Sequence, residues 1–551
     1  MEYSIENIKE IEKNQEKINK LEKKIANLKK NKLYSYKLEK YNNEKKLLEK
    51  TNEYYQTLPK KEAKIKKALA KEKKKRYQIL NGNITAAIIM ICFPLAVYGF
   101  FNSFYSLIDS MMASLIKAEA SGSGAVNISN VAVISQLKSM ISAFGAGIAG
   151  GGGVLVSRYY GAGNLKKAKK TASNMVFISV ILSLVLLLLL APSASLILQV
   201  AQVPTINSDV ILYFELILIE LILVAINNIF ICLEKIKGNS KKILILNVLA
   251  LIIKLLMNVI FIFGFHVNKI IFLEIATIIG QAFIFIYGII VLFSNKNLLK
   301  ISLKEMKPEK EIIIKIFKLS IPIFLGKFVM SLGKAIVNAL CGYYYSLATD
   351  GLITGALGIS NNLSGLVTST TNVFEEGEST IVSQNIGNKN LKRTIKTFIR
   401  TLIIVGIISL VGFILVRFIF LDSLTGLFNK NNNSEKMSEY VKEIFVYDCI
   451  SIPSLGLTSA LLGLLYGYGK TFLSSILNFS RIGIRIISLI ICHSVGLNYQ
   501  AAGISMGISN VLIGVLALIF LTIFLISLYK NGYRNMKISD EEPKDLGLSF
   551  D

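Results

Sequence analysis

Cysteine and histidine, the side chains that most often hold metal ions, are scarce in this chain. Its 551 residues include only five cysteines and two histidines. No two cysteines have the CxxC spacing of zinc or redox sites, and His266 and His493 are far apart in the sequence. No Ser/His/Asp set and no pattern of paired carboxylates indicates catalysis. The sequence therefore predicts no enzyme, no metal site and no cofactor.

Charged residues are also few, at 18% of the chain, and they are unevenly distributed. Residues 1–80 hold 24 Lys and Arg against 12 Glu, whereas the rest consists largely of long apolar runs. A soluble domain could not bury so many apolar runs, but a bilayer accommodates each as a helix of roughly 20 residues. Residues 1–80 lack the apolar stretch of a secretory signal peptide, so the first apolar segment is expected to direct insertion.

Twelve apolar segments are long enough to span the hydrocarbon core of a membrane. They predict an all-α polytopic membrane protein with about twelve transmembrane helices. The segments are 84–108, 127–156, 172–199, 209–232, 242–265, 270–294, 312–345, 352–382, 395–420, 440–467, 471–495 and 501–529.

Basic residues gather in alternate loops between these segments. Four loops are rich in Lys and Arg, and they contain residues 158–170, 235–242, 296–310 and 389–396. Because loops rich in Lys and Arg stay in the cytoplasm, we expect these four loops on that side of the cell membrane. An even number of spans then places both termini in the cytoplasm as well.

The sequence of the apolar body repeats itself. Residues 156–167, VSRYYGAGNLKK, recur as VSQNIGNKNLKR at 382–393, and Pro94 in the first segment matches Pro322 in the seventh. Because six is even, two six-helix halves would share one orientation, with an axis along the membrane normal and a site between them. We therefore predict an N-terminal arm (1–80), two pseudo-symmetric six-helix bundles (81–300 and 301–535) and a cytoplasmic tail (536–551).

The arm at 1–80 is expected to be helical and cytoplasmic. Isoleucine recurs every seventh residue between Ile11 and Ile25, as in a coiled coil, although Asn14 interrupts the pattern. The basic run at 60–76 predicts either contact with anionic lipid at the membrane surface or a plain solvated helix. No nucleic-acid-binding fold accompanies these basic residues, so we expect no nucleic acid partner.

Ionisable side chains within membrane spans are costly and usually functional. Asp109 lies at the end of the first apolar segment. A carboxylate held in a low-dielectric cavity binds a proton or Na⁺, which would couple ion entry to substrate exit. The alternative is a passive aspartate wetted at the membrane interface, and burial alone favours neither.

Polar residues recur at spacings of four or seven within other segments, which places them on one face of each helix. These stripes should face the interior of the bundle. There their members either pair with one another, as Lys327 and Glu375 could, or contact the substrate or ion directly. The candidates for the substrate cavity are Glu220, Asn227, Lys254, Lys327, Lys334, Asn372, Glu375, Glu376, Asp448, Arg481 and Arg485.

Four short motifs stand out in the body of the chain. They are Phe104–Asp109 after Pro94, Gly152–Lys167, its echo Ile381–Arg393, and Lys237–Asn239. Together they resemble motifs of the multidrug and toxic compound extrusion (MATE) transporters, over about residues 82–530. The resemblance implies an antiporter driven by H⁺ or Na⁺ that exports amphiphilic xenobiotics, alternating between outward-open and inward-open states. It also implies that Asp109 is the coupling aspartate and Asn258 a cation-site asparagine.

The sequence departs from the family pattern at its acidic positions. Ile262 stands where many members carry an acidic residue, and Lys327 and Lys334 occupy a seventh helix that is acidic in others. Typical substrates of the family are organic cations. A cavity this basic would repel them unless the acidic candidates neutralise it. We therefore hypothesise an anionic or zwitterionic substrate.

Two other functions stay open at this point. A lipid-linked saccharide flippase of the same superfamily would usually have about fourteen spans, more than the twelve expected here. A membrane scaffold that uses the arm as its interaction module would transport nothing, although it would not need polar stripes in both halves. Deleting residues 1–78 should abolish the role of a scaffold but leave the flux of a transporter.

Overall fold

The computed structural model folds most of the chain into helices, which form two compact units. The first unit comprises the described residues up to Lys74 together with Ser294–Leu298, and the second runs from Lys75 to Phe293 and from Leu299 onward. The expected tail at 536–551 lies outside the described residues. Those residues are 5–29, 41–46, 48–50, 52, 60–116, 124–201, 203–267, 269–302, 306–349, 352–426 and 434–530.

The first unit is built on α1 (Ile5–Lys29) and the start of α3 (Lys60–Asn81). Ile18 and Leu21, which belong to the apolar stripe of α1, are buried in a small cluster with Leu48. The stripe that resembles half of a coiled coil is therefore covered by a neighbouring segment of the same chain.

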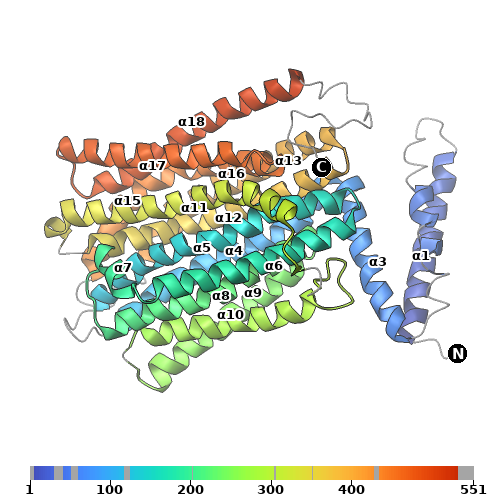
Figure 1. Ribbon diagram of the computed structural model, residues 1–551. Helices are drawn as coiled ribbons and strands as arrows, with labels where there is room; N and C mark the ends of the chain where they lie inside the picture. The colour runs from blue at the N-terminus through green and yellow to red at the C-terminus, as the bar shows by residue number, and fades with distance from the viewer. Residues whose placement is uncertain are drawn as a thin grey trace. The chain divides into compact units, whose positions relative to one another are not determined.

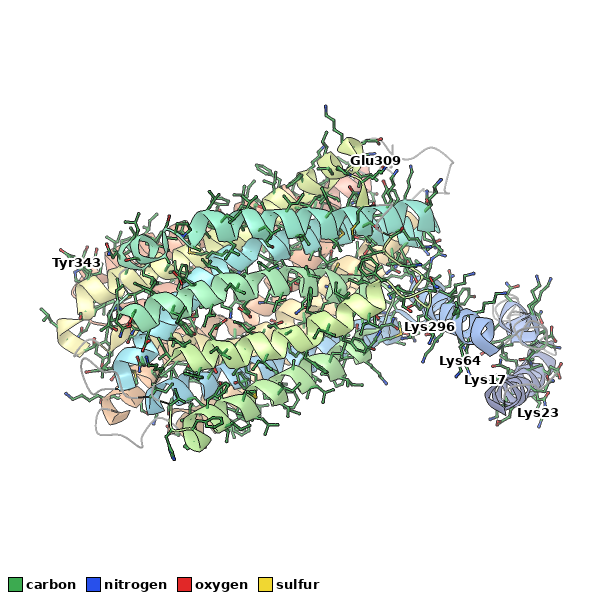
Figure 2. All side chains as sticks on the ribbon, turned by 60° about the horizontal axis from the view of Figure 1, so that its bottom comes forward. Lys17, Lys23, Lys64, Lys296, Glu309 and Tyr343 are labelled. Carbon is green, nitrogen blue, oxygen red and sulfur yellow. The ribbon has the colours of Figure 1, made fainter. Side chains whose placement is uncertain are left out.

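The positions of the polar side chains on α1 agree with this packing. Asn14, which interrupts the apolar pattern, is buried and donates a hydrogen bond to Asn52 (Nδ2 to Oδ1, 3.1 Å). A buried amide with a partner of its own kind costs little. Lys17 and Lys23 lie on the exposed part of the helix and extend away from its ribbon (Figure 2).

The second unit holds the long apolar helices, and the two halves of the sequence repeat form corresponding sets. The first half forms α4 (Ile84–Leu115), α5 (Gly124–Gly161), α6 (Leu165–Leu190), the short α7 (Ala194–Val200), α8 (Ser208–Ile236), α9 (Ser240–Val259) and α10 (Ile271–Leu292). The second half forms α11 (Lys310–Tyr345), α12 (Ile353–Gly387), α13 (Leu391–Ile414), α14 (Leu421–Gly426), α15 (Ser434–Asp448), α16 (Ile452–Gly467), α17 (Thr471–Ser494) and α18 (Gln500–Lys530). The described residues include no β-strand.

Ten helical segments in the described residues are long and apolar enough to cross a membrane. Among the described helices of the two repeated halves, the two long ones outside this set are α11, with 36 residues, and α12, with 35. Both carry charged side chains in their middle, such as Lys327 and Glu375, and they lie among the other helices in the centre of the second unit (Figure 1). The fold is therefore that of an all-α membrane protein with about twelve transmembrane helices, as the sequence predicts.

The two halves meet through repeat-related helices. Figure 1 shows α4, α5, α11 and α12 in the middle of the second unit, with α9 and α10 on one side and α17 and α18 on the other. A Cβ atom on Gly151 of α5 would overlap the backbone of Ser320 on α11, and one on Gly377 of α12 would overlap Cys92 on α4. Gly151 and Gly377 hold the same position in the two copies, as do Ser320 and Cys92. The same close contact is thus made twice, which supports the pseudo-symmetry.

The repeated motif at 156–167 and 382–393 forms the same helix–loop–helix corner in each half. Asn164 caps α6 by accepting a hydrogen bond from the backbone of Lys167 (3.1 Å), and Asn390 caps α13 by accepting one from Arg393 (3.2 Å). Asparagine is a favoured N-cap, so the Asn-Leu-Lys of both copies marks where the next helix begins.

These corners lie at one end of the second unit, where α5, α8, α12 and α16 finish. Hydrogen bonds there cross between the halves in a repeat-related pair. Arg158 donates to the carbonyl of Gly467 (3.3 Å), and Gln384 donates to the carbonyl of Ile236 (2.8 Å). We call this end the closed end, because its helices are bonded across the boundary between the halves.

The last turns of α3 also bind the closed end and belong to the second unit. Lys75 donates to the side chain of Asn239 (2.6 Å) in the α8–α9 loop, and Arg76 donates to the carbonyl of Gly161 (3.0 Å). Arg393 of the second half donates to the carbonyl of Ile79 (2.9 Å). A deletion through residue 78 would therefore remove contacts of the transmembrane body along with the arm.

Candidate functional site

A carboxylate–ammonium pair lies inside the first half, between α4 and α9. Tyr105 and Asp109 are four residues apart on α4, and Lys254 and Asn258 are four apart on α9, so each helix turns both side chains toward the other. Lys254 Nζ is 3.0 Å from Asp109 Oδ2, and Asn258 Nδ2 donates to Asp109 Oδ1 (3.2 Å) and to the Tyr105 hydroxyl (2.8 Å). Lys254 Nζ also lies 4.5 Å from the centre of the Tyr105 ring. We call these four residues the α4–α9 cluster.

The α4–α9 cluster is largely buried but keeps some contact with solvent. The side chain of Asp109 is 25% exposed and that of Lys254 is 14% exposed, whereas Asn258 is fully buried. Within the described residues, the amide oxygen of Asn258 has no hydrogen-bond partner. A carboxylate and an unsatisfied amide oxygen are the ligands that small hard cations prefer. The cluster therefore has the chemistry of a cation site in which a lysine of the chain itself supplies the positive charge.

A second ionic cluster lies deeper in the first half, and sequence reasoning found only one of its members. Lys138 of α5 pairs with Glu220 of α8 (2.5 Å) and with Glu274 of α10 (3.4 Å), and both glutamates are buried. One ammonium between two carboxylates leaves one negative charge to be balanced. The rule that flags ionisable residues in apolar spans would have found Lys138 and Glu274 had it been applied to every span.

Asn227, another candidate from the first half, is buried and has a structural partner. Its amide donates to both the carbonyl and the side chain of Gln281 on α10, at 3.0 Å each. These bonds join α8 to α10, away from the α4–α9 cluster. Neither Asn227 nor Glu220 lines the cavity that the second-half candidates share.

That cavity, which we call the central cavity, has a volume of about 460 Å³ and lies between the halves. One wall is formed by α5, through Ser139 and Ser142, and the others by α11, α12, α15, α16, α17 and α18. Every candidate that the sequence places in the second half lines it, and these are Lys327, Lys334, Asn372, Glu375, Glu376, Asp448, Arg481 and Arg485. The helical spacing therefore selected residues that share one chamber.

Ion pairs in the central cavity differ from the expected ones. Lys327 pairs with Glu376 (3.5 Å) and not with Glu375, the suggested partner, and Lys235 of α8 also pairs with Glu376 (2.7 Å). Adjacent residues on a helix point about 100° apart, so the rotation of α12 decides which glutamate meets the lysines. Lys235 joins the two halves through this contact.

Three other candidates in the central cavity bind neutral partners. Arg485 donates to Ser509 Oγ (3.0 Å) and Asn510 Oδ1 (2.8 Å), Asp448 accepts a hydrogen bond from Ser364, and Asn372 accepts one from Ser459 (3.0 Å). The part of the chain that the structure describes contains no group of three His, Cys, Asp or Glu placed to hold a metal ion. All five cysteines are buried and free.

The two halves also match a known family separately. The MatE family model matches residues 94–260 and 322–491, one copy in each half and together more than half of the chain. The chain belongs to the MATE family. The first-half match includes Asp109, Lys254 and Asn258, and the second-half match includes all the candidates that line the central cavity.

Relatives of this MATE chain among characterised proteins are multidrug exporters by name. Multidrug export protein MepA from Staphylococcus aureus (strain MSSA476) is 24% identical over 359 residues, which cover 63% of this chain and 73% of that protein. MepA from Staphylococcus haemolyticus is 27% identical over 232 residues, covering 41% and 50%.

Solved structures share the fold of this MATE chain. A MATE protein in complex with MaL6 superposes with a TM-score of 0.72 at 16% identity, covering 82% of this chain and 99% of that one. A multidrug resistance MATE transporter in an outward-facing conformation gives 0.72 at 16% identity, with 82% and 98% covered. A transporter from Pyrococcus furiosus, described as having a binding pocket of reverse polarity, gives 0.73 at 16% identity, again with 82% and 98% covered.

Proposed function

We propose that this MATE transporter is an antiporter that exports amphiphilic small molecules in exchange for H⁺ or Na⁺. The observation that carries the proposal is the α4–α9 cluster, a carboxylate and a buried amide set apart from the central cavity. Two separate sites, one for the ion and one for the substrate, are what an exchanger needs. The names of the MepA relatives support export of multiple drugs as the activity.

In this proposal Lys254 competes with the coupling ion for the carboxylate of Asp109. A proton or Na⁺ that binds Asp109 takes the place of the ammonium, which lies 3.0 Å from the carboxylate. The lysine is then released toward the Tyr105 ring or into water, and α4 and α9 lose a bond that holds them together. Ion binding would thereby change the packing of the first half, which is the link that coupling requires.

The closed end is the side that we assign to the cytoplasm, because the basic loops lie there. The carrier would reach its inward-open state by breaking the bonds that Arg158 and Gln384 make across the halves. These are two single hydrogen bonds from side chains to carbonyls, so each contributes little by itself. Their repeat-related placement supports a rocking motion of one half against the other.

The test is flux in proteoliposomes under an imposed pH or Na⁺ gradient, with Asp109→Asn beside the parent chain. Asp209→Asn is the matched control, since Asp209 also pairs with a lysine (Lys269, 3.2 Å) but at the start of α8. We expect gradient-driven flux in the parent and the control, and loss of its gradient dependence in Asp109→Asn. Parental flux in the Asp109 variant would refute the coupling role.

A further inference from the structure

The central cavity has one basic wall and one acidic wall. Its four cationic side chains come from two adjacent helices, Lys327 and Lys334 from α11 and Arg481 and Arg485 from α17. The three carboxylates come from α12 and α15. Because the spacing on α11 is seven residues and that on α17 is four, each pair lies on one face of its helix.

The acidic wall is largely neutralised within the protein. Glu376 pairs with both Lys235 and Lys327, so two ammonium groups compensate one carboxylate. Asp448 accepts a hydrogen bond from Ser364 and lies within electrostatic range of Lys334 and Arg485. Glu375 is the remaining carboxylate of the cavity, and it forms no ion pair within the described part of the chain.

The basic wall keeps unused binding capacity. In the described residues, Lys334 has no hydrogen bond or ion pair, and the charges that act on it are two cations, Arg481 and Arg485, against one carboxylate, Asp448. The Arg481 guanidinium donates a long hydrogen bond to the sulfur of Met330 (3.9 Å), and its Nε is buried without a partner among the described residues. Buried ammonium and guanidinium groups that lack a counter-ion in direct contact are unfavourable, so a ligand that supplies an anion would bind strongly.

We propose that the central cavity binds an amphiphile through an anionic group, a carboxylate or a phosphate, at Lys334 and Arg481. This proposal rests on the proposed function, because it names the substrate class of that transporter. A guanidinium binds carboxylate and phosphate through paired hydrogen bonds, and Lys334 adds a point charge. Met330, Leu455, Leu462 and Met506 also line the cavity, and they offer a surface for the apolar part of the ligand.

The two walls also explain why a simple organic cation is the poorer ligand. It would approach Glu375, but the carboxylate of Glu376 is already held by two lysines. It would also share the chamber with Lys334, Arg481 and Arg485. Binding of a cation therefore gains the attraction of Glu375 and of Asp448, whose carboxylate already accepts a hydrogen bond from Ser364, and it meets three repulsive charges in a medium of low dielectric constant.

The test compares two probes that share a fluorophore and differ in the charge of the head group. These are 1-pyrenebutyrate and (1-pyrenebutyl)trimethylammonium, titrated by fluorescence anisotropy against the purified full-length protein without any ion gradient. We expect the anion to bind more tightly. Lys334→Gln and Arg481→Gln should each weaken anion binding by roughly tenfold or more, the usual effect of losing a hydrogen bond to a charged group.

Two kinds of control keep the result interpretable. Lys318→Gln makes the same chemical change on an exposed part of α11 outside the cavity, and it should leave the affinity unchanged. Lys334→Arg and Arg481→Lys keep the charge and should retain most of the binding, which separates loss of charge from loss of fold. Tighter binding of the cation, absence of saturable anion binding, or equal effects of all the glutamine variants would overturn the proposal.

The binding assay and the flux assay can refute the two proposals separately. If the anion binds at Lys334 and Arg481 but no gradient drives flux, the anion site stands and the antiporter proposal fails. If gradients drive flux of pyrene cations while the anion does not bind, the antiporter proposal stands and the anion site is refuted. A phosphate-bearing pyrene probe of the same length then tells which anionic group the site prefers.

Discussion

Replacing Lys254 with methionine should show how much the lysine stabilises the carboxylate of Asp109 in the α4–α9 cluster. Methionine keeps the length and the apolar stem of lysine but removes the ammonium that lies 3.0 Å from Asp109. The carboxylate then keeps the hydrogen bond from Asn258 (3.2 Å) and loses its counter-ion. We expect a less stable protein in which a bound cation restores what the lysine supplied.

The size of the effect follows from the contacts and from their exposure. A hydrogen bond between charged groups contributes about 1.5–3 kcal/mol to stability. The side chains of Lys254 and Asp109 are 14% and 25% exposed, so solvent screens part of this interaction and the lower end applies. We expect a coupling energy of about 1.5 kcal/mol between Lys254 and Asp109.

The assay is a double-mutant cycle of Lys254→Met and Asp109→Asn, read as apparent free energies of unfolding in graded SDS in mixed micelles. The double variant should be more stable than the sum of the two single changes predicts, by the coupling energy. Added Na⁺ or acid, whichever supplies the coupled ion, should stabilise Lys254→Met but not the double variant, because only the former keeps a free carboxylate. An ion at ten times its dissociation constant adds about 1.4 kcal/mol.

A second cycle on Asp209 and Lys269 provides the reference. That pair is 3.2 Å apart, and its lysine is far more exposed than Lys254, at 49% against 14%, although Asp209 is only 18% exposed. Surface pairs contribute at most about 1 kcal/mol. A coupling energy between Lys254 and Asp109 no larger than that of the reference pair would refute the reasoning. So would stability of Lys254→Met that neither Na⁺ nor pH alters.

Three further predictions use other parts of the structure. Deleting residues 1–70 should leave gradient-driven flux in proteoliposomes near the parental rate, because this cut keeps the contacts that the end of α3 makes with the closed end; loss of flux would give the arm a part in transport. Lys389→Gly should raise the free energy of unfolding by about 0.5–1 kcal/mol, because Lys389 has a left-handed backbone (φ 56°). Gly163→Ala at the repeat-related position (φ 82°) should lower the free energy of unfolding. The SDS titration measures both, and a loss of stability in Lys389→Gly would contradict the strain argument. Gln384→Ala should favour opening at the closed end, measured as faster maleimide labelling of a Ser157→Cys reporter in a chain without its native cysteines; an unchanged rate would show that this bond does not restrain the end.

Much of the candidate site was predictable because helix geometry is regular. The eight polar candidates of the second half all line the central cavity, and six of them were selected by spacings of four or seven, which keep side chains on one helix face. Glu375 and Asp448 have no candidate at such a spacing. The family resemblance implied a coupling aspartate at Asp109 and a cation-site asparagine at Asn258, and the structure brings the two within hydrogen-bond distance. Their role in coupling stays a prediction.

The pairings were not predictable. Lys327 meets Glu376 instead of Glu375, because the rotation of α12 decides which of two adjacent carboxylates faces α11. Lys254 was a candidate for the substrate cavity, yet it binds Asp109 in the first half. A lysine has a long flexible stem, so its partner depends on which carboxylate the packing brings within reach.

Hydropathy, the internal repeat and residue spacing were enough to predict the membrane fold, the two related halves and the faces on which polar residues lie. The reason is that backbone polar groups inside a bilayer must bond within the protein, and an apolar run of about 20 residues satisfies them as a helix, so hydropathy and spacing translate directly into structure. The packing of the helices settles how charge is distributed among those faces. It sets which lysines are neutralised, which carboxylate holds its own internal cation, and that Lys334 and Arg481 share a cavity without an ion pair among the described residues. These outcomes depend on the distances between helices, and distances across a bundle are set by packing that no single segment contains.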